Sequence, residues 1–470
     1  MAAGRTSRFR TVSLLVTTVT ALAVIIVALW NGGAFNNLIC GGDCGAAAIR
    51  KPDGLNLDPV DAAVAAPPDV ASDLNASAIQ SAVADALGSD KLGDHVGFAA
   101  VDPRTGEAVN SSGSGAFVPA STTKLLTVLT ALAHLDPQQR FVTSVVRSGN
   151  QVILVGGGDP YLWSKPPKKP IFAVEADIRT LAKRTAAALG SSGVTSVHLD
   201  YNASRFVGPA INPAWEDSYI AERLVAPISA LWVDEGYVHG VWSADPPKSA
   251  ADAFKDKLED AGIDVNGDPD SVTVPAGATA VADAKSATVA RIAEQLISSS
   301  DNEAAEVLLR QAAIGAGHPG SFADGVATMQ DVLRAKGIDT AGLEIHDGSG
   351  LSRHNRITPT TLAQVVAKAS TDPRTASLVA DLPTANFSGS MRRRFHKADE
   401  AKGVVRAKTG TLTEVHSLAG YVIDRNGSPI VFAVMADHVK DVPDLDAEAA
   451  MDAVPAALVR CSCSARNVGP

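Results

Sequence analysis

Ser121 and Lys124 form the single Ser-x-x-Lys of the chain, at the start of an apolar segment whose pattern predicts a buried helix. On a helix, side chains three positions apart lie on the same face, so the lysine amine can reach the serine oxygen. Apolar neighbours such as Leu125 and Leu126 would desolvate the amine, which favours its neutral form and lets it act as a base. The pair indicates a serine nucleophile; the alternative is a serine that caps the helix beside a solvated lysine.

A second short motif, Ser-x-Asn, occurs at Ser148–Asn150 and at Ser300–Asn302. The first fits a plain hairpin turn. The second joins two predicted helices, so its side chains can project into a cleft. The simpler interpretation of the second motif is that Ser300 or Asp301 caps the helix that follows.

The third motif is Lys408-Thr409-Gly410-Thr411, which follows a predicted strand beside a predicted hairpin. On a strand, Lys408 and Gly410 share one face, and Thr409 and Thr411 share the other. A glycine at such a place lets the backbone of a ligand approach the strand closely. The alternative is an exposed edge strand that carries a protective lysine.

The three motifs follow one another in the order Ser-x-x-Lys, Ser-x-Asn, Lys-Thr-Gly, which is the signature of penicillin-recognising serine enzymes. On these residues the chain resembles the low-molecular-mass class C penicillin-binding proteins, the DacB-like D-alanyl-D-alanine carboxypeptidase/endopeptidase family. The resemblance covers about residues 78 to 459. It extends to five further stretches: GGGDPYL (156–162), APISAL (226–231), SDNEAAEVLLR (300–310), DGSGLSR (347–353) and AKTGTL (407–412).

The resemblance implies a site and a mechanism. The implied catalytic residues are Ser121, Lys124 and Ser300. The implied substrate-binding residues are Asn302, Lys408, Thr409, Gly410 and Thr411. Activated by the lysine, the serine would attack the carbonyl between two D-alanines of a peptidoglycan stem peptide, with backbone N–H groups as the oxyanion hole. The family needs no cofactor and no metal, and β-lactams would leave a slowly hydrolysed acyl group on the serine.

The elements that must position these residues are helices interleaved with antiparallel hairpins, which predicts an α+β fold with a sheet flanked by helices. Helices are expected over 78–87, from 124, over 288–298, 301–313, 362–369 and 447–459. Strands are expected over 95–101, 108–109, 142–155 (a hairpin), 403–407, 417–423 and 429–436. Residues 156–284 read as short strands and turns. The resemblance identifies the fold as a penicillin-binding/β-lactamase-like transpeptidase domain.

The long separation between Ser121 and Ser300 implies a smaller inserted domain, which is a mark of this family. We expect a peptidase domain in two pieces, 78–144 and 286–470, and an inserted domain over 145–285. A cytoplasmic stub with a signal anchor would occupy 1–31, and an extracytoplasmic linker 32–77.

The N-terminus predicts the compartment. Uncharged Thr11–Trp30 follows Arg5, Arg8 and Arg10, and twenty helical residues span about 30 Å, the thickness of a bilayer core. The arginines should stay cytoplasmic, so the rest of the chain would face the cell-wall side of the bacterial cytoplasmic membrane. Cleavage near Gly32–Ala34 and secretion are the alternative.

Four cysteines stand in two pairs near the chain ends: Cys40 and Cys44, and Cys461 and Cys463. A Cys-x-Cys pair does not close on itself easily, so in an oxidising compartment we expect Cys461 and Cys463 to bond to the N-terminal pair. The alternative is a zinc ion held by four thiolates.

Composition limits the partners. Asp and Glu outnumber Lys and Arg by 51 to 41, for a formal net charge of −10, which argues against a nucleic-acid binder because phosphate neutralisation needs clustered cations. The resemblance implies stem peptides and β-lactams as partners, and the N-terminal helix predicts the membrane as a third.

Three other functions compete with the peptidase. A β-lactamase would need a general base for fast deacylation, and Glu344 is a conceivable one. A catalytically idle cell-wall scaffold would not need Ser121 and Lys124. A Ser-His-Asp triad from His346, Asp347 and Ser349 is disfavoured, because side chains so close on one loop do not align easily. The choice between carboxypeptidase and endopeptidase stays open, since both cleave after a D-alanine.

Overall fold

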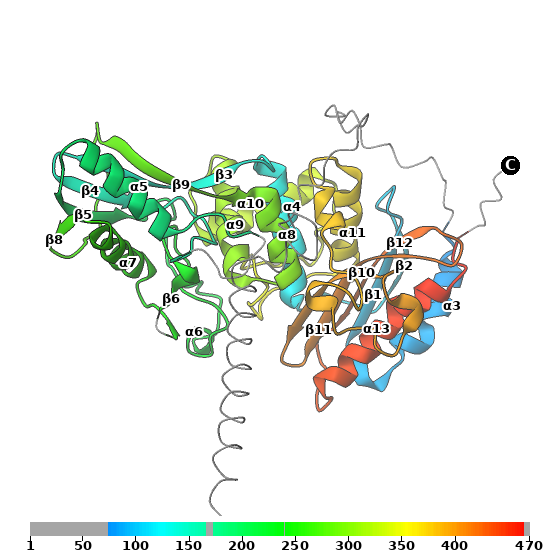
Figure 1. Cartoon of the computed structure of the whole chain (residues 1–470). Coiled ribbons are helices and arrows are strands. Elements are labelled where there is room, and N and C mark those ends of the chain that lie inside the picture. Colours follow the sequence, from blue (N-terminus) through cyan, green and yellow to red (C-terminus); the bar gives the residue numbers. More distant parts are fainter. Residues whose placement is uncertain (1–73, 166–172, 239, 465–470) are drawn as a thin grey trace, which may run out of the picture. The chain divides into compact units, whose positions relative to one another are not determined.

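The computed structural model of the chain describes residues 74–165, 173–238 and 240–464. The described part contains two five-stranded sheets and one two-stranded sheet, and helices pack against the two larger sheets and between them (Figure 1). The predicted signal anchor, the N-terminal part of the linker, Cys40 and Cys44 lie outside the described residues. Among the residues that are described, no helix combines the length and the apolar character that crossing a membrane requires.

The first sheet is antiparallel throughout, as the sequence predicts. Its strands stand in the order β10, β11, β12, β1, β2, so the N-terminal strand β1 pairs with the C-terminal strand β12. Their bounds are Arg406–Leu412, Val415–Ile423, Pro429–Ala436, Val96–Val101 and Ala108–Ser112. Along β1, Phe98 and Ala100 belong to one core cluster and Ala99 and Val101 to another, so both faces of the sheet are buried.

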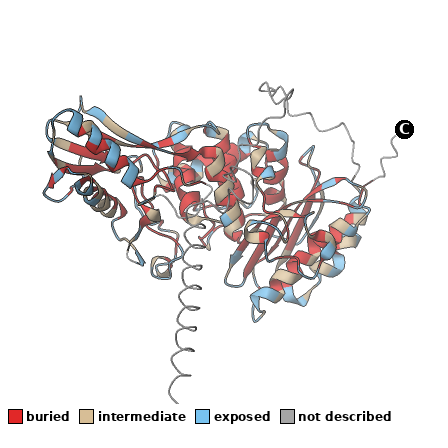
Figure 2. Cartoon of the chain, in the orientation of Figure 1, coloured by how far each residue is buried: buried red, intermediate tan, exposed pale blue. Residues whose placement is uncertain are grey.

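Two groups of helices cover these faces. Helices α3 (Ala76–Leu87) and α13 (Asp444–Arg460) pack together on one side, and α11 (Pro359–Thr371) packs on β1 and β12 from the other (Figure 1). Behind α11 lie α4 (Thr123–His134), α8 (Val289–Ser299), α9 (Asn302–Gly315), α10 (Phe322–Ala335) and the short α12 (Ser377–Ala380). Helix α4 is buried from Thr123 to Leu132, as its apolar sequence predicts, and Figure 2 shows how continuous the buried interior is.

The second sheet is mixed and lies between α4 and α8 in the sequence. Its order is β8, β5, β4, β3, β9, with parallel pairing at β4–β5 and β5–β8. The bounds are Asp264–Asn266, Ser196–Asn202, Gln151–Val155, Arg140–Ser148 and Thr279–Thr288. With α5 (Ile178–Ser191) and α7 (Pro246–Asp260) this sheet has its own hydrophobic cluster. We propose that this layer is the expected insert; its boundaries at 145 and 285 stay a prediction.

The remaining described elements are short. Helix α6 covers Ser218–Ala221, and strands β6 (Tyr237–Val238) and β7 (Val241–Trp242) form the two-stranded sheet. Single 3₁₀ turns lie at Asp90–Leu92, Ala120–Thr122, Asp234–Gly236, Gly389–Met391 and Asp399–Ala401.

The prediction for residues 156–284 is wrong in one respect, because it contains no long helix, whereas α5 and α7 are regular. The start signals of both are present in the sequence. Asp177 accepts a hydrogen bond from the backbone N–H of Thr180 (2.8 Å), and Asp245 precedes Pro246 at the first helical position. Strand β10 also runs further than expected, so the Lys-Thr-Gly motif lies inside it rather than after it.

The predicted disulfide connectivity is wrong. Cys461 and Cys463 bond to each other, with Cα atoms 5.1 Å apart, which lies within the range that a disulfide spans. The chain leaves α13 in an extended conformation at Cys461, and this spacing suffices to close the short loop.

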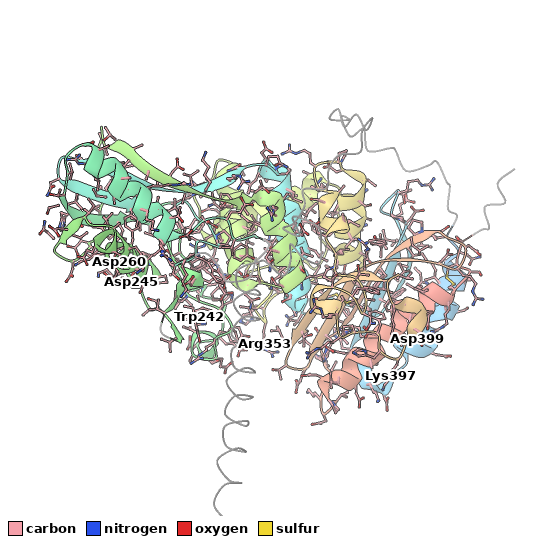
Figure 3. The ribbon with its side chains drawn as sticks, viewed as in Figure 1. Trp242, Asp245, Asp260, Arg353, Lys397 and Asp399 are labelled. Atoms are coloured by element: carbon pink, nitrogen blue, oxygen red, sulfur yellow. A yellow bond between two sulfur atoms is a disulfide. The ribbon has the colours of Figure 1, made fainter. Side chains whose placement is uncertain are left out.

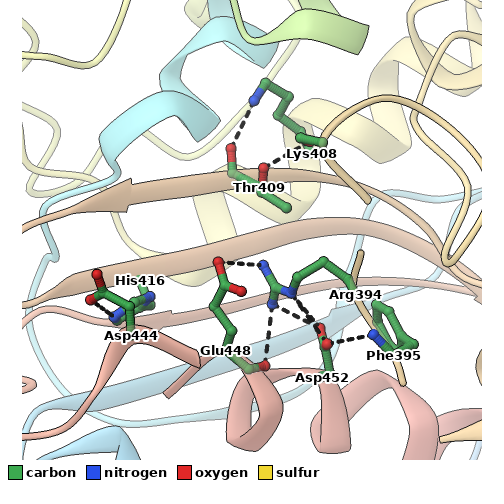
Figure 4. A network of polar contacts seen from close by, with 9 residues as sticks. Arg394, Phe395, Lys408, Thr409, His416, Asp444, Glu448 and Asp452 are labelled. Atoms are coloured by element: carbon green, nitrogen blue, oxygen red, sulfur yellow. Dashed lines mark hydrogen bonds and ion pairs between the residues drawn. The ribbon is translucent and has the colours of Figure 1, made fainter. Parts of the chain in front are cut away.

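A buried ion pair ties α13 to the segment before β10 (Figure 4). The Arg394 guanidinium donates to Oδ1 of Asp452 at 2.7 Å, and the backbone N–H of Phe395 donates to Oδ2 at 2.8 Å. Both charged side chains are less than a tenth exposed. Burial raises the pKa of Asp452, while the facing guanidinium opposes that shift.

We expect Asp452→Ala to lower the free energy of unfolding by about 3 kcal/mol, because it leaves the buried Arg394 charge with only the more distant Glu448 carboxylate, 3.7 Å away, as a partner. Chemical denaturation measures this effect. The matched control is Asp446→Ala on the same helix, whose half-exposed ion pair with Lys91 should be worth less than about 1 kcal/mol. Equal losses for the two variants would contradict the assignment.

Candidate active site

Ser121 lies in the tight turn Ala120–Thr122 that leads into α4. Hydroxyl groups of Thr122 and Ser417 each donate to the carbonyl oxygen of Pro119 at 2.6 Å, which fixes the backbone before the serine. Ala120 has a φ of 47°, an unusual value for a residue with a side chain. These contacts hold a strained turn in place, which is common at functional sites.

Lys124 is completely buried one turn later, and its Nζ lies 2.9 Å from Oγ of Ser121. The amine also donates to Oδ1 of Asn302 (2.8 Å) and to the carbonyl oxygen of Ser349 (2.6 Å). A neutral amine has two N–H groups and one lone pair. With two acceptors occupied, the lone pair is left facing the serine hydroxyl, which is the arrangement that a general base needs.

Electrostatics favour that neutral amine. Burial lowers the pKa of Lys124 from 10.5 to about 8, against the opposing effect of nearby carboxylates, of which Asp347 and Glu306 act most strongly. The lysine therefore loses its proton close to physiological pH.

A buried carboxylate positions the Ser349 carbonyl. Glu306 on α9 accepts the backbone N–H groups of Gly348 (3.0 Å) and Ser349 (2.7 Å). Burial, with a contribution from Asp347, raises the pKa of Glu306 to about 7. The motif analysis missed Glu306; the signal available in the sequence is a glutamate among apolar residues of a predicted buried helix.

The loop that follows is built around Asp347. Its carboxylate accepts from the backbone N–H groups of Gly350 (3.0 Å) and Ser352 (2.7 Å), from Nδ2 of Asn355 (2.7 Å) and from Nε1 of Trp215 (2.9 Å). Asp347 therefore organises the loop instead of polarising a histidine, which removes the support for the Ser-His-Asp triad.

Ser300 ends α8 in a left-handed conformation, with φ 62° and ψ 39°. Asp301 caps α9 by accepting the backbone N–H of Ala304 at 2.8 Å, so the cap expected of Ser300 or Asp301 belongs to the aspartate. The Ser300 hydroxyl is instead 2.8 Å from Nζ of Lys408, which donates to it. Asp301 therefore has the capping role, and the Ser300 side chain is free to face the Lys408 amine, as the cleft interpretation expects.

Lys408 is a second completely buried lysine. Besides Ser300, its Nζ donates to the carbonyl oxygen of Thr409 at 2.8 Å (Figure 4). Burial and the nearby Lys124 amine hold the pKa of Lys408 well below its usual range. Two lysines thus lie beside two hydroxyls, Lys124 beside Ser121 and Lys408 beside Ser300.

Strand β10 passes close to the serine turn. A Cβ added at Gly410 would lie 2.2 Å from Oγ of Ser417 and 2.6 Å from the carbonyl oxygen of Pro119, so only glycine fits. Lys408 and Gly410 are buried, and Thr411 is exposed, as the predicted alternation requires. The Thr409 hydroxyl donates to Oγ of Ser390 at 2.8 Å; Ser390 carries no sequence signal.

Side chains and carbonyls from the region between Ser121 and Ser300 hold the Ser300–Asn302 turn. The Tyr161 hydroxyl donates to Oδ2 of Asp301 (3.0 Å), and Nδ2 of Asn302 donates to the carbonyl oxygen of Leu224 (2.7 Å). Glu303 accepts the backbone N–H of Ala226 at 2.9 Å. The GGGDPYL and APISAL stretches, noted only for their resemblance, therefore support the turn.

Two other residues from the sequence analysis lie away from these contacts. Glu344 is exposed, and its backbone pairs with Arg356 in an isolated bridge, which fits a structural loop. Arg353, labelled in Figure 3, forms an ion pair with Glu216 at 3.1 Å and donates to the carbonyl oxygen of Thr413 at 3.1 Å.

Comparison with known proteins identifies the family of this chain. The family model described as the D-Ala-D-Ala carboxypeptidase 3 (S13) family matches residues 79–244 and 239–458. A carboxypeptidase of Mycobacterium tuberculosis is 34% identical over 435 residues, which cover 89% of this chain and 92% of the relative. A D-alanyl-D-alanine carboxypeptidase of an Actinomadura species is 28% identical, with 74% and 78% covered.

Among solved structures, penicillin binding protein 4 of Haemophilus influenzae superposes with a TM-score of 0.66 at 20% sequence identity. The match covers 82% of this chain and 98% of that one. At this identity the likeness concerns the fold, and it confirms the expected α+β penicillin-binding architecture.

The pKa of Lys124 makes the first prediction of this site. If the neutral amine takes the serine proton, acylation of Ser121 by a fluorescent penicillin should accelerate about tenfold per pH unit at acid pH and level off above about pH 8. Stopped-time labelling between pH 5.5 and 9.5 measures the profile. A rate that is flat across this range would contradict the assignment of the base.

The second prediction concerns Gly410. We expect Gly410→Ala to slow acylation by about a hundredfold, because the added methyl group must push β10 away from the serine turn. The same labelling assay measures the loss. Gly190→Ala is the matched control, since a Cβ there meets nothing within 4 Å and should leave the rate unchanged. A Gly410→Ala variant with the wild-type rate would show that the close approach does not matter.

Proposed function

The chain belongs to the D-Ala-D-Ala carboxypeptidase 3 (S13) family, and we propose that it hydrolyses the D-alanyl-D-alanine bond of peptidoglycan stem peptides through an acyl-enzyme on Ser121. The observation that carries this proposal is the buried Lys124 amine, 2.9 Å from the serine oxygen and with its two other contacts made to acceptors. In this arrangement, the Ser121 hydroxyl is the nucleophile and the Lys124 amine is its base.

The first half of the reaction forms the acyl-enzyme. Neutral Lys124 accepts the hydroxyl proton as Oγ of Ser121 attacks the carbonyl carbon between the two D-alanines. The backbone N–H groups of Ser121 and Thr411 would bind the developing oxyanion. The C–N bond then breaks, and Ser300, hydrogen-bonded to the Lys408 amine, gives a proton to the leaving D-alanine amine. The proton that Lys124 took from Ser121 would replace it on Ser300, so Lys124 is neutral again when the acyl-enzyme has formed.

The second half consumes water. A water molecule attacks the ester carbonyl and gives a proton to neutral Lys124. The lysine passes that proton to Oγ of Ser121 as the ester C–O bond breaks, which releases the shortened peptide and restores the Ser121 hydroxyl and the neutral amine. Asn302 would bind the substrate amide, while the Lys408 N–H groups and the Thr409 and Thr411 hydroxyls would donate hydrogen bonds to the terminal carboxylate. The same acyl-enzyme serves carboxypeptidase and cross-link endopeptidase reactions, because both break the bond that follows a D-alanine.

β-Lactams present an acyl group to the same serine and are proposed inhibitors. A bound penicillin ring stays attached after the amide opens, so no small leaving group departs to make room for water. Glu344, the candidate base for a β-lactamase, is exposed with its backbone in a loop bridge, which disfavours that alternative.

We also propose that the enzyme works on the cell-wall side of the bacterial cytoplasmic membrane. The support is the sequence of residues 1–31, where three arginines precede twenty uncharged residues. A stem-peptide substrate is found on that side, so the predicted topology and the proposed reaction agree.

We expect fluorescent penicillin to label the purified protein in a band that persists for hours, and Ser121→Ala to abolish that band. Gel fluorescence of the intact chain, followed over time, measures both. Ser111→Ala, which changes an exposed serine on β2, is the control and should label normally. A label that fades within minutes would favour the β-lactamase, and no label on folded wild-type protein would favour the idle scaffold.

A further inference from the structure

Two Asp-His pairs meet at one end of the first sheet. Asp94 and His95 come directly before β1, and Asp437 and His438 come directly after β12. Because β1 and β12 are antiparallel, with Val96 opposite Ala436, the two pairs lie side by side. Nitrogen or carboxylate oxygen atoms of His95, Asp437 and His438 all lie within 4.8 Å of one another. Asp94 is next to them, 3.5 Å from Nδ1 of His438.

The ring of His95 is oriented by contacts at both nitrogens. Its Nε2 lies 3.1 Å from the carbonyl oxygen of Ser114, and its Nδ1 lies 2.5 Å from Oδ1 of Asp437. A neutral imidazole has a single N–H, which cannot serve both oxygens. With Nε2 directed at the Ser114 carbonyl, Nδ1 faces the Asp437 carboxylate, and either a second N–H or a metal ion between the two atoms would satisfy this contact.

Asp437 is oriented in the same way. Its side chain is 6% exposed, and Oδ2 accepts the backbone N–H of Val118 at 2.8 Å. Oδ1 is thereby directed toward His95. Metal-binding histidines donate their other N–H to a carbonyl or carboxylate, and metal-binding carboxylates are themselves hydrogen-bonded. The two less exposed members of the cluster, His95 and Asp437, have these outer contacts.

We propose that His95, Asp437 and His438 bind a zinc ion, with Asp94 or water as the fourth ligand. Imidazole nitrogen and carboxylate oxygen are ligands that Zn²⁺ accepts in tetrahedral sites, whereas Mg²⁺ and Ca²⁺ are bound through oxygen. The 2.5 Å separation between His95 and Asp437 must widen to admit the ion. Because the His438 side chain is exposed, the ion can enter from solvent on that side, and the His438 ring can rotate to bind it.

The ion would brace the chain that leads to the serine turn. The His95 ring stacks on Phe117, with centroids 4.0 Å apart, and Asp437 holds the N–H of Val118. Phe117 and Val118 come just before Pro119, whose carbonyl oxygen accepts the hydrogen bonds from the Thr122 and Ser417 hydroxyls that fix the turn. The zinc site therefore has a structural role outside the chemistry of Ser121, and it does not rest on the proposed reaction.

The test is zinc binding by the full-length chain after treatment with a chelator. Titration with zinc chloride in competition with a chromophoric chelator should give one tight site per chain, and Co²⁺ in its place should give the visible absorption of a tetrahedral site. His438→Ala should weaken zinc binding at least tenfold, and His438→Asp, which restores an oxygen ligand, should recover most of it.

His198→Ala is the matched control. The His198 side chain is 43% exposed and lies 3.3 Å from Asp200, so it offers a His–Asp contact that belongs to no group of three candidate ligands in the described part of the chain. Binding that is absent, or that His438→Ala leaves unchanged, would overturn the proposal. So would an equal loss in His198→Ala, because it would show nonspecific surface binding.

Discussion

The structure depends on burying two lysine amines beside two serine hydroxyls. A pKa of about 8 for Lys124, against 10.5 for the unfolded chain, means that the folded state holds this proton more weakly. Below pH 8 the buried amine therefore costs about 3 kcal/mol of folding stability, and the cost disappears as the pH rises through 10.5. The surrounding fold supplies what keeps the amines in place, namely the fully buried helix α4, the Asp347 loop and the Glu306 carboxylate on α9.

The motif residues could be predicted because each has a side chain whose chemistry is distinctive and whose element has a clear period. Their supports could not. Glu306 acts through backbone N–H groups of a distant loop, and Tyr161 reaches Asp301 from more than a hundred residues away. Nothing in local sequence spacing records such partners. The disulfide prediction failed for a related reason: the closing distance between Cys461 and Cys463 is set by the backbone where α13 ends.

Chain segments far apart in sequence share the work of positioning. The turn at Ser300–Asn302 is held by Tyr161 and the Leu224 carbonyl from one side and by Lys124 and Lys408 from the other. The serine turn is held by Ser417 on β11 and, through Val118, by Asp437 after β12. Several elements at once thus fix the turns that carry the Ser121 and Ser300 hydroxyls. This preorganisation lets polar groups stabilise a transition state without first having to reorient.

The central claim is that Lys124 is neutral when it faces Ser121, and its titration tests that claim most directly. NMR of protein with labelled lysine side chains, with the Lys124 signal assigned from its absence in Lys124→Arg, gives the midpoint without reference to any substrate. The account predicts a midpoint near 8. A midpoint near 10.5, the value of a solvated lysine, would leave far less than 1% of the amine neutral at pH 7, against about a tenth for a midpoint near 8, and would contradict its role as the base.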